Sequence, residues 1–450
     1  SYYATRKPYG EWLHANLVEL KDLQIPNKNT IKLTHHELTT LQKAFGYSYE
    51  DIKTSILPMA QDGAEQVAAM GADITLPPLD KGYVPLFNYF KQLFAQVTNP
   101  PFDAIREEIV TDTSVCMGED GNILEAKAEN CHVLKVHNPI LTSTDMLKIK
   151  NMKVPGFKVV TISITYYKGT SLDKAIERLF IDADKAYRDG ANILILSDRE
   201  VDEYHVPIPS LLAVSALQQH LVNTKKRTSL AMVLESADPR EVHHFATLLG
   251  YGASVINPYL AHETIRDLIE NKSLDKDYYA AESDYNKAIL KGIVKIASKM
   301  GISTIQSYQG SKNFEAMGVS KEVIEKYFTG TVSRIGGITL EDISNRLEAL
   351  HSSAFDPLGL DVDNDVDSVG SHKFRSGKSQ HLYNPETIYL LQQSTRTGDY
   401  KTFKEYSAYL NNEDRNMNLR SMLGFDFSKN SAIDISDVES VESICKRFKT

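Results

Sequence analysis

The middle portion of the sequence predicts an α/β fold with a buried parallel sheet. From Phe157 onward, short runs rich in β-branched residues alternate with amphipathic helical segments, a pattern typical of βαβ units. The regions before and after this portion have helical patterns, so we expect an α-rich N-terminal segment and an α-rich C-terminal extension. The 450 residues, 42% hydrophobic and 24% charged, are enough for two or three domains with cores of their own.

The N-terminal elements are predicted as helices. Tyr9 to Lys53 reads as a helical linker region, in which Thr34 and Glu37 have the spacing of a capping box. A further helix is expected from Tyr49 to Met59. Another is expected from Pro85 to Val97, because apolar residues recur there at helical spacing, and it must end before the pair Pro100-Pro101.

The central elements are predicted to alternate. Strands are expected at Lys158 to Thr165, Asn192 to Leu196, Ser229 to Leu234, Ala253 to Asn257 and Ile302 to Gln306. Helices are expected at Ser171 to Asp189, Ser210 to Leu221, Pro239 to Leu249 and Asp284 to Met300.

Three of these strands end in polar residues, and Asp198, Glu235 and Asn257 stand out among them. The carboxyl ends of parallel strands are where barrels and open α/β sheets hold their ligands, so these three residues are candidates for a strand-end site. The alternative is that they cap the following helices and bind turn amides. The sequence leaves both interpretations open.

No catalytic, cofactor-binding or metal-binding residue is predicted. His243 and His244 are adjacent and point about 100° apart on a helix, so they cannot share one metal ion. The acidic tract Asp361 to Asp367 lacks the glycine and final glutamate of a calcium loop, and we interpret it as a solvated loop. The three cysteines are widely separated and form no iron–sulfur motif.

Composition also argues against two classes of partner. The net charge of −9 disfavours a nucleic-acid surface, because phosphate binding needs clustered Lys and Arg. No stretch has the length and apolarity of a membrane span or the order of a signal peptide, so we expect a cytoplasmic protein without membrane contact.

The C-terminal part begins with a stretch from Phe355 to His381 that is rich in Asp, Ser and Gly and is expected to be a linker. Asn384-Pro385-Glu386 then has the pattern of a helix start, with the helix continuing through Thr387 to Gln393. Thr402 to Leu410 is expected to form a further helix, and a domain boundary is expected near Ala354.

Several long segments resemble one family, the large subunit of glutamate synthase. They are YFKQLFAQVTNPPFDAIREE (Tyr89 to Glu108), ILILSDRE (Ile193 to Glu200), PIPSLLAVSAL (Pro207 to Leu217), ESADPREVHHFATLLGYGASVINPYLA (Glu235 to Ala261), SKMGISTIQSYQG (Ser298 to Gly310) and YFTGTVSRIGGI (Tyr327 to Ile338).

The resemblance implies a central domain that is a degenerate relative of the family's (β/α) flavin barrel. It implies a linker after an amidotransferase domain at 1–53, the central domain at 54–354, and a linker with the truncated start of the FMN-binding synthase domain at 355–450. The glutaminase cysteine, the FMN and the iron–sulfur cluster of the family are expected outside this chain. The expected partners are the covalently attached amidotransferase and FMN domains, with a small reductase subunit or ferredoxin as electron donor.

The resemblance also implies an ammonia tunnel between the two flanking domains, and Thr98 and Asn99 are our candidates for its wall. A helix ended by two prolines would leave free carbonyl groups there to face a small polar molecule. The alternative is that both residues only satisfy the helix end. Asp103, Arg106 and Glu107 are expected to form a salt-bridged cluster that fixes the loop.

Three hypotheses of function therefore remain at this point. The chain is a connecting segment of glutamate synthase that is catalytically silent alone, or an independent barrel enzyme that uses Asp198, Glu235 and Asn257. The third hypothesis is a scaffold subunit that assembles with separate amidotransferase and flavin subunits.

Overall fold

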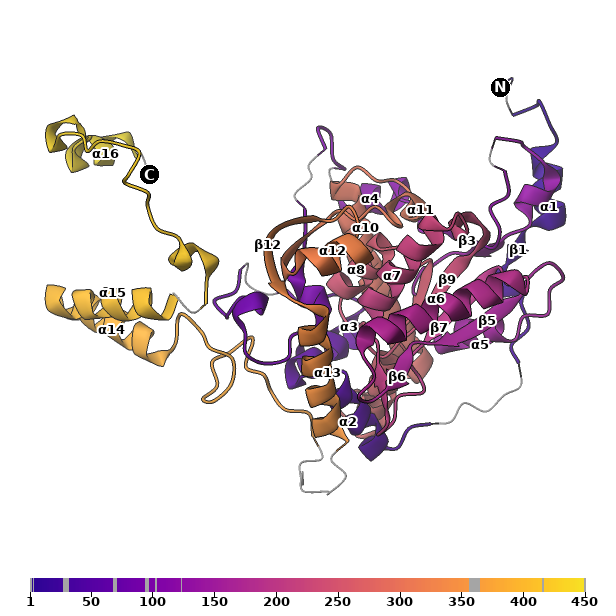
Figure 1. The fold of residues 1–450 in the computed structure, drawn as a ribbon, viewed down its shortest axis with the longest axis horizontal. Helices are drawn as coiled ribbons and strands as arrows, with labels where there is room; N and C mark the ends of the chain where they lie inside the picture. Colours follow the sequence, from indigo (N-terminus) through magenta and orange to yellow (C-terminus); the bar gives the residue numbers. More distant parts are fainter. Residues whose placement is uncertain are drawn as a thin grey trace. The chain divides into compact units, whose positions relative to one another are not determined.

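The computed structural model describes residues 2, 4–26, 32–67, 71–93, 97–101, 103–122, 124–355, 365–414 and 417–448. The chain divides into two compact units, which are described separately (Figure 1). Unit 1 consists of Ser1–Ala72 and Asp80–Ser379, and unit 2 of Asp73–Leu79 and Gln380–Thr450.

A four-stranded parallel sheet lies at the centre of unit 1. Its strands stand in the order β10-β9-β7-β5, and every neighbouring pair is parallel. The strands are β5 (Val159–Ser163), β7 (Ile193–Ser197), β9 (Ala231–Glu235) and β10 (Val255–Asn257). The four predicted strands up to Asn257 are thus confirmed with shifts of a few residues at their ends.

Each strand is joined to its spatial neighbour by a helix, and the order never reverses. The joining helices are α6 (Leu172–Arg188), α7 (Ser210–Asn223) and α8 (Val242–Gly250). A further helix, α9 (Tyr259–Glu270), follows the last strand β10 and was not predicted. Right-handed crossovers that advance in one direction place their helices on one face, as in a (β/α) barrel, whereas an open doubly wound sheet reverses direction. In Figure 1, α6 lies beside β5 and α7 beside β9. The fold is therefore α/β and degenerate barrel-like, as expected, with four strands of an arc and no closed barrel among the residues described.

Three of the four strands of this sheet are buried on both faces, whereas the edge strand β5 is mostly half-buried, with Thr161 exposed. Every residue of β7, β9 and β10 is buried, as expected for parallel strands between covering layers. Burial of each Val, Leu or Ile side chain stabilises the fold by about 1.5–3 kcal/mol. The apolar run ILIL of β7 therefore makes a large contribution to the core of unit 1.

A second, three-stranded sheet has the order β12-β11-β2. Its strands are β2 (Phe90–Gln92), β11 (Phe314–Val319) and β12 (Val332–Ile338). β11 is parallel to β12 and antiparallel to β2. β12, at one edge, is exposed over most of its length, in contrast to the central sheet.

Shorter elements complete unit 1. Two small sheets consist of β1 (Val18–Glu19), β3 (Val115–Met117) and β4 (Leu134–Val136), and of β6 (Thr165–Tyr167) and β8 (His205–Pro207). The remaining helices are α1 (Tyr9–Asn16), α2 (His35–Ala44), a π-helical turn (Asp51–Ile56), α3 (Leu57–Asp62), α4 (Ala104–Val110), α5 (Ser143–Lys150), α10 (Tyr278–Lys299), α11 (Ile305–Tyr308), α12 (Lys321–Tyr327) and α13 (Leu340–Ala354), with 3-10 turns at Leu20–Asp22, Leu86–Tyr89, Ala128–Cys131 and Arg227–Ser229. The 3-10 turn at Pro77–Leu79 belongs to unit 2.

The predicted capping box at the start of α2 is confirmed. The Thr34 hydroxyl accepts a hydrogen bond from the Glu37 backbone N–H, and the Glu37 carboxylate accepts one from the Thr34 N–H at 2.8 Å. Two donors at the helix start are thereby satisfied by side chains only three residues apart.

Two predicted elements are wrong. Pro85 to Val97 is not one helix, because a 3-10 turn at Leu86–Tyr89 leads into β2, which pairs with β11. Ile302 to Gln306 is not a strand, because the Thr304 side chain accepts a hydrogen bond from the Ser307 N–H and so caps α11. Long-range pairing decides the first case and a local cap decides the second.

Unit 2 is built around two helices, α14 (Pro385–Thr397) and α15 (Tyr400–Asp414). The predicted start at Asn384 is confirmed, since its side-chain oxygen accepts from the N–H groups of Glu386 and Thr387 at 3.0 and 3.1 Å. Asp73 binds the His381 ring at 2.9 Å and the Tyr383 N–H at 3.0 Å, which ties the outlying segment 73–79 to the start of this unit. Beyond α15 lie 3-10 turns at Leu419–Met422 and Ile435–Asp437 and the helix α16 (Val441–Arg447).

Much of the acidic tract at 361–367 lies outside the described residues. Within the described part of the chain, no helix combines the length and the apolarity needed to cross a membrane.

Candidate functional site at the carboxyl end of the parallel sheet

The three strand-end candidates lie together, as the parallel topology requires. Glu235 and Asn257 are the last residues of neighbouring strands and stand in register, and Asp198 directly follows the adjacent strand β7. All three are at most 1% exposed. The carboxyl end of the sheet thus carries a compact polar cluster inside the protein.

Glu235 is the centre of an ion cluster. Its carboxylate accepts from Lys150 Nζ at 2.7 and 2.8 Å, from Arg199 Nε at 2.6 Å and from Ser197 Oγ at 2.7 Å. Lys150 is the last residue of α5, so this pair also fastens α5 to the sheet. Burial opposes ionisation of Glu235, but the charges of Arg199 and Lys150 prevail and hold its pKa below the ordinary value.

Asp198 has the opposite electrostatic setting. Its oxygens accept from the Ser236 hydroxyl, from the Ala237 N–H at 3.0 Å and from the Tyr259 side chain. No Lys or Arg of the described chain forms an ion pair with it. Burial therefore raises the pKa of Asp198 to about 7, only partly offset by these hydrogen bonds.

Asn257 is only half satisfied. Its side-chain nitrogen donates to the Leu141 carbonyl at 3.0 Å, whereas its oxygen has no hydrogen-bond partner among the described residues. The Leu141 segment runs beside β10, since Ile140 and Ile256 form a parallel bridge. Asn257 thus holds a neighbouring segment against the edge of the sheet.

The loop from Ser236 to Glu241, which joins β9 to α8, connects this cluster to the rest of unit 1. Asp238 accepts from the N–H and hydroxyl of Ser210 at 3.2 and 2.7 Å, so it caps the start of α7. Arg240, 2% exposed, donates to the carbonyls of Phe45 and Gly46. In this loop, therefore, buried side chains bind distant backbone groups.

The same loop receives two further bonds and an ion pair. The Tyr47 hydroxyl donates to the Ala237 carbonyl at 2.8 Å, and the Tyr285 hydroxyl donates to the Arg240 carbonyl at 2.9 Å. Asp51 forms an ion pair with Arg240 at 3.1 Å. The N-terminal segment and α10 are thus both held by the loop that carries the strand-end cluster.

Lys150, Arg199 and Arg240 were not among the residues predicted from the sequence. Arg199 and Arg240 follow the polar ends of β7 and β9 by only a few residues, which is a signal that could have suggested them. Lys150 lies 85 residues from Glu235, and no local pattern predicts that pair.

The tunnel candidates Thr98 and Asn99 lie in a bend on the surface, and both are exposed. The predicted helix that would end at these residues is wrong, because Phe90–Gln92 form the strand β2. Residue Val97 packs tightly against Gly301. Among the described residues, no hydrogen bond or ion pair joins Thr98 or Asn99 to the strand-end cluster.

The neighbouring charged residues also differ from expectation. Asp103 accepts from the Arg106 N–H at 2.8 Å and so caps α4, and Glu107 pairs with Lys299 at 2.8 Å. The expected cluster of Asp103, Arg106 and Glu107 is therefore a helix cap and a separate ion pair to α10.

The histidines have structural partners. His243 contacts the Phe87 carbonyl at 3.0 Å, and His244 pairs with Glu241 at 3.2 Å and stacks on the Phe87 ring. Across the described residues, no group of three His, Cys, Asp or Glu side chains is arranged to hold a metal ion.

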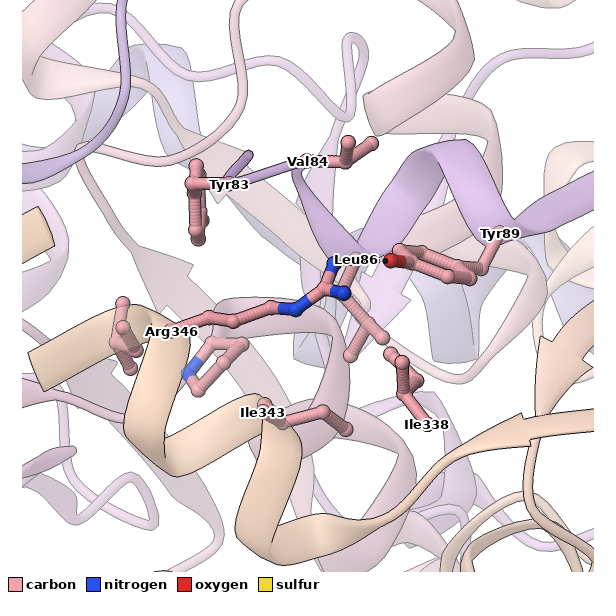
Figure 2. Close-up of a pocket in the computed structure, with 9 residues that line it drawn as sticks. Tyr83, Val84, Leu86, Tyr89, Ile338, Ile343 and Arg346 are labelled. Atoms are coloured by element: carbon pink, nitrogen blue, oxygen red, sulfur yellow. Dashed lines mark hydrogen bonds between the residues drawn. The ribbon is translucent and has the colours of Figure 1, made fainter. Parts of the chain in front are cut away.

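A small pocket lies near the second sheet and the start of α13 (Figure 2). Its lining is mainly aliphatic and aromatic: Tyr83, Val84, Leu86, Tyr89, Pro209, Ile338, Ile343, Arg346 and Leu347. Arg346 points toward Leu86 and Tyr89 and donates to the Tyr89 hydroxyl at 3.2 Å. The space open to the centre of a water molecule is about 20 Å³, enough for one water but far below the several hundred Å³ of a metabolite site.

Comparison with known proteins shows which family this chain resembles. Residues 40–320 match the model of the glutamate synthase central domain. The chain is 41% identical over 447 residues to the glutamate synthase [NADPH] large chain of Bacillus subtilis (strain 168), covering 99% of this chain and 29% of that one. It is 38% identical to glutamate synthase [NADH] of Schizosaccharomyces pombe (99% and 22%) and 36% identical to ferredoxin-dependent glutamate synthase 2 of Synechocystis (99% and 30%).

Among solved structures, the flavin-binding domain of baker's yeast flavocytochrome b2 is 15% identical, covering 44% of this chain and 41% of that chain, at a TM-score of 0.26. That score is too low to support an argument, so the assignment depends on the sequence matches. Their coverage means that the chain spans between a fifth and a third of the length of these relatives. The match over residues 40–320 and the identity along nearly the whole chain show that the protein belongs to the glutamate synthase central-domain family.

Proposed function

We propose that this chain is the central connecting portion of a glutamate synthase, which makes glutamate from 2-oxoglutarate and glutamine-derived ammonia. In this role it links an amidotransferase domain to an FMN domain and performs no chemistry itself. The proposed divisions are a linker at 1–53, the central domain at 54–354, and at 355–450 a linker with the start of the FMN domain. The relatives' names include NADPH, NADH and ferredoxin, and the electron donor for this polypeptide is one of these classes.

The observation that carries this proposal is the filled carboxyl end of the parallel sheet. In barrel enzymes that end holds the ligand, but here the oxygens of Glu235 are occupied by Lys150, Arg199 and Ser197. A flavin phosphate placed there would meet Glu235 and Asp198 with both nearby cations already engaged, so these residues do not fit FMN. The cluster is suited to holding the sheet, α5 and the β9–α8 loop in fixed positions.

A direct test uses the purified chain. We expect no stoichiometric flavin absorbance near 450 nm after reconstitution with FMN and no glutamine hydrolysis. A chain that binds one FMN, or that hydrolyses glutamine, would contradict a purely connecting role and favour the independent barrel enzyme.

Thr98 and Asn99 remain our candidates for the wall of an ammonia tunnel, on the strength of the family resemblance of their segment. Their exposure in unit 1 is compatible with a surface that a neighbouring domain covers. A neutral hydroxyl and amide can bind ammonia by hydrogen bonds without adding a charge.

The test is the coupling between the two half-reactions in the longer polypeptide. With Thr98→Val and Asn99→Ala together, we expect ammonia to escape, so that glutamine hydrolysis exceeds glutamate synthesis. The matched control is Asn223→Ala with Thr224→Val, an exposed Asn-Thr pair at the end of α7. Equal coupling in both double variants would remove Thr98 and Asn99 from the tunnel but leave the connecting role intact.

A further inference from the structure

β12 (Val332–Ile338) is much more exposed than the strand β11 beside it. Six of its seven residues are exposed, with only Ile338 buried, whereas four of the six residues in its neighbour β11 are buried. Because successive side chains point to opposite faces, this exposure means that the described residues of unit 1 form no complete covering layer on either face of β12. Figure 1 shows β12, in orange, curving along the margin of unit 1.

One edge of β12 is also open. Within the described chain the strand pairs with β11 alone, and the sheet order places it at the end of the sheet. Apolar side chains are part of the open surface, with Val332 37% and Ile335 38% exposed. Edge strands that stay solvated are usually protected by prolines, bulges or outward charges.

The protection of β12 is incomplete. Its register against β11 shifts at two places, which irregularly bends the strand. Its one charged residue, Arg334, is drawn back to β11 by an ion pair with Glu315 at 2.7 Å. No proline interrupts the strand. After Arg334, the exposed residues Ile335, Gly336 and Gly337 therefore include no charge or proline that would protect the edge.

Close packing requires glycine at only one of these two positions. A Cβ on Gly337 would lie 2.1 Å from the Gly318 carbonyl oxygen, so close packing against β11 requires glycine there. A Cβ on Gly336 would meet nothing within 4 Å, and its φ lies outside the left-handed region. Glycine weakens a strand by about 0.5–1 kcal/mol relative to alanine and often marks the close approach of another backbone. Among the described residues, none comes within 4 Å of the position that a Cβ of Gly336 would take.

We propose that β12 is a docking surface, and that an extended segment of the flanking polypeptide lies across it with its backbone close to Gly336. This inference depends on the connecting role proposed above. The partner's contact residues are apolar where they face Val332 and Ile335, and its backbone lies near the bare peptide groups around Gly336.

The flanking polypeptide is the occupant because most of it lies outside this chain. The chain covers only 29%, 22% and 30% of three relatives, so about three quarters of each polypeptide is available to cover unit 1. Covalent attachment also gives such a segment a high effective concentration, so a modest surface suffices for stable docking.

The adjacent glycines give a matched pair for the test. In this chain alone, Gly336→Val is expected to leave the melting temperature unchanged within about 2 °C, because the side chain enters open space and valine favours strands. Gly337→Val is expected to lower it clearly, because the new side chain collides with β11. This comparison establishes that Gly336→Val folds.

The decisive measurement is hydrogen exchange of the amides from 332 to 338. We expect these amides to exchange at least about tenfold more slowly in the longer polypeptide than in this chain alone, and Gly336→Val to abolish that protection. Equal exchange rates in both proteins would overturn the proposal. Protection in this chain alone that depends on protein concentration would also overturn it, by showing that a second copy is the occupant.

The docking proposal and the proposed function can fail independently of one another. Flavin binding or glutamine hydrolysis by the chain would contradict the connecting role whatever the exchange of β12. Unprotected amides in a longer polypeptide that couples both half-reactions would reject the docking surface alone.

Discussion

The two larger sheets of unit 1, the four-stranded and the three-stranded sheet, differ in how completely residues of this chain cover them. In the four-stranded sheet, β7, β9 and β10 are buried on both faces, and the polar carboxyl end of the sheet is filled by ion pairs and hydrogen bonds from within the chain. The three-stranded sheet has an exposed strand, an open edge and a glycine without a local reason. If β12 is the docking surface proposed above, substitutions in the central sheet should act on folding, and substitutions in β12 should act on assembly with the longer polypeptide.

The largest effect is expected in the core of the central sheet. Ile195→Ala in β7, where the side chain is fully buried, should lower the free energy of unfolding by about 4 kcal/mol, from lost burial plus a cavity. Urea denaturation of the chain measures this loss. A loss below about 1 kcal/mol would mean that the residues around Ile195 repack to fill the cavity, and that the core of the central sheet is less rigidly packed than its burial indicates.

A slightly smaller effect is expected at the strand-end cluster. Glu235→Gln should lower the free energy of unfolding by about 3 kcal/mol, because Lys150 and Arg199 lose their common carboxylate in a largely buried site. Glu200→Gln, at an exposed position three residues after β7 ends, is the control and should change little. Equal values for the two variants would show that the ion cluster does not stabilise the sheet.

The pH dependence of folding stability that Asp198 causes is a further test of the strand-end cluster. Its pKa is about 7 in the folded protein and near 4 when unfolded, so the folded state holds a proton that the unfolded state releases. Stability from this group is therefore fully present below about pH 4 and is lost as the pH rises to about 7, by at most about 1.4 kcal/mol per pH unit.

Asp198→Asn should remove this slope, whereas Asp62→Asn, at an exposed position, should keep it. Denaturation of the three proteins at pH 5, 6 and 7 measures the slopes. An unchanged slope in Asp198→Asn would assign the pH dependence to other groups.

The smallest effect is expected on β12. Ile335→Ala removes the same atoms as Ile195→Ala, but from a side chain that is 38% exposed, and should cost this chain less than about 1 kcal/mol. In the longer polypeptide the cost should rise if the surface is covered, and denaturation of both proteins compares them. A loss as large as that of Ile195→Ala in the chain alone would erase the distinction between the two sheets.

Local signals in the sequence predicted a good part of the fold. The capping residues Thr34 and Asn384 and the alternation from β5 to β10 depend on neighbours in sequence, and they are confirmed. The prediction of a helix at 85–97 was wrong because the aromatic-rich pattern of this segment suits either a helix or a strand. The pairing of Phe90 with Ala316, far along the chain, decides in favour of the strand.

The site was predictable only in part. Asp198, Glu235 and Asn257 could be grouped because topology brings the ends of parallel strands together. What they bind could not be predicted, since Lys150 comes from α5 and the Leu141 carbonyl from a segment 116 residues before Asn257. Such contacts depend on packing in three dimensions and leave no periodic trace.

The loop from Ser236 to Glu241 also has a consequence for synthesis on the ribosome. Tyr47 is 190 residues earlier in the chain than its partner Ala237, and Phe45 is 195 residues before Arg240. At about 5–20 residues per second, the ribosome needs roughly 10–40 s to deliver the loop after the N-terminal segment has emerged. During that interval the aromatic and apolar residues around Tyr47 have no place to dock, so nascent chains of this length should be the ones that chaperones bind.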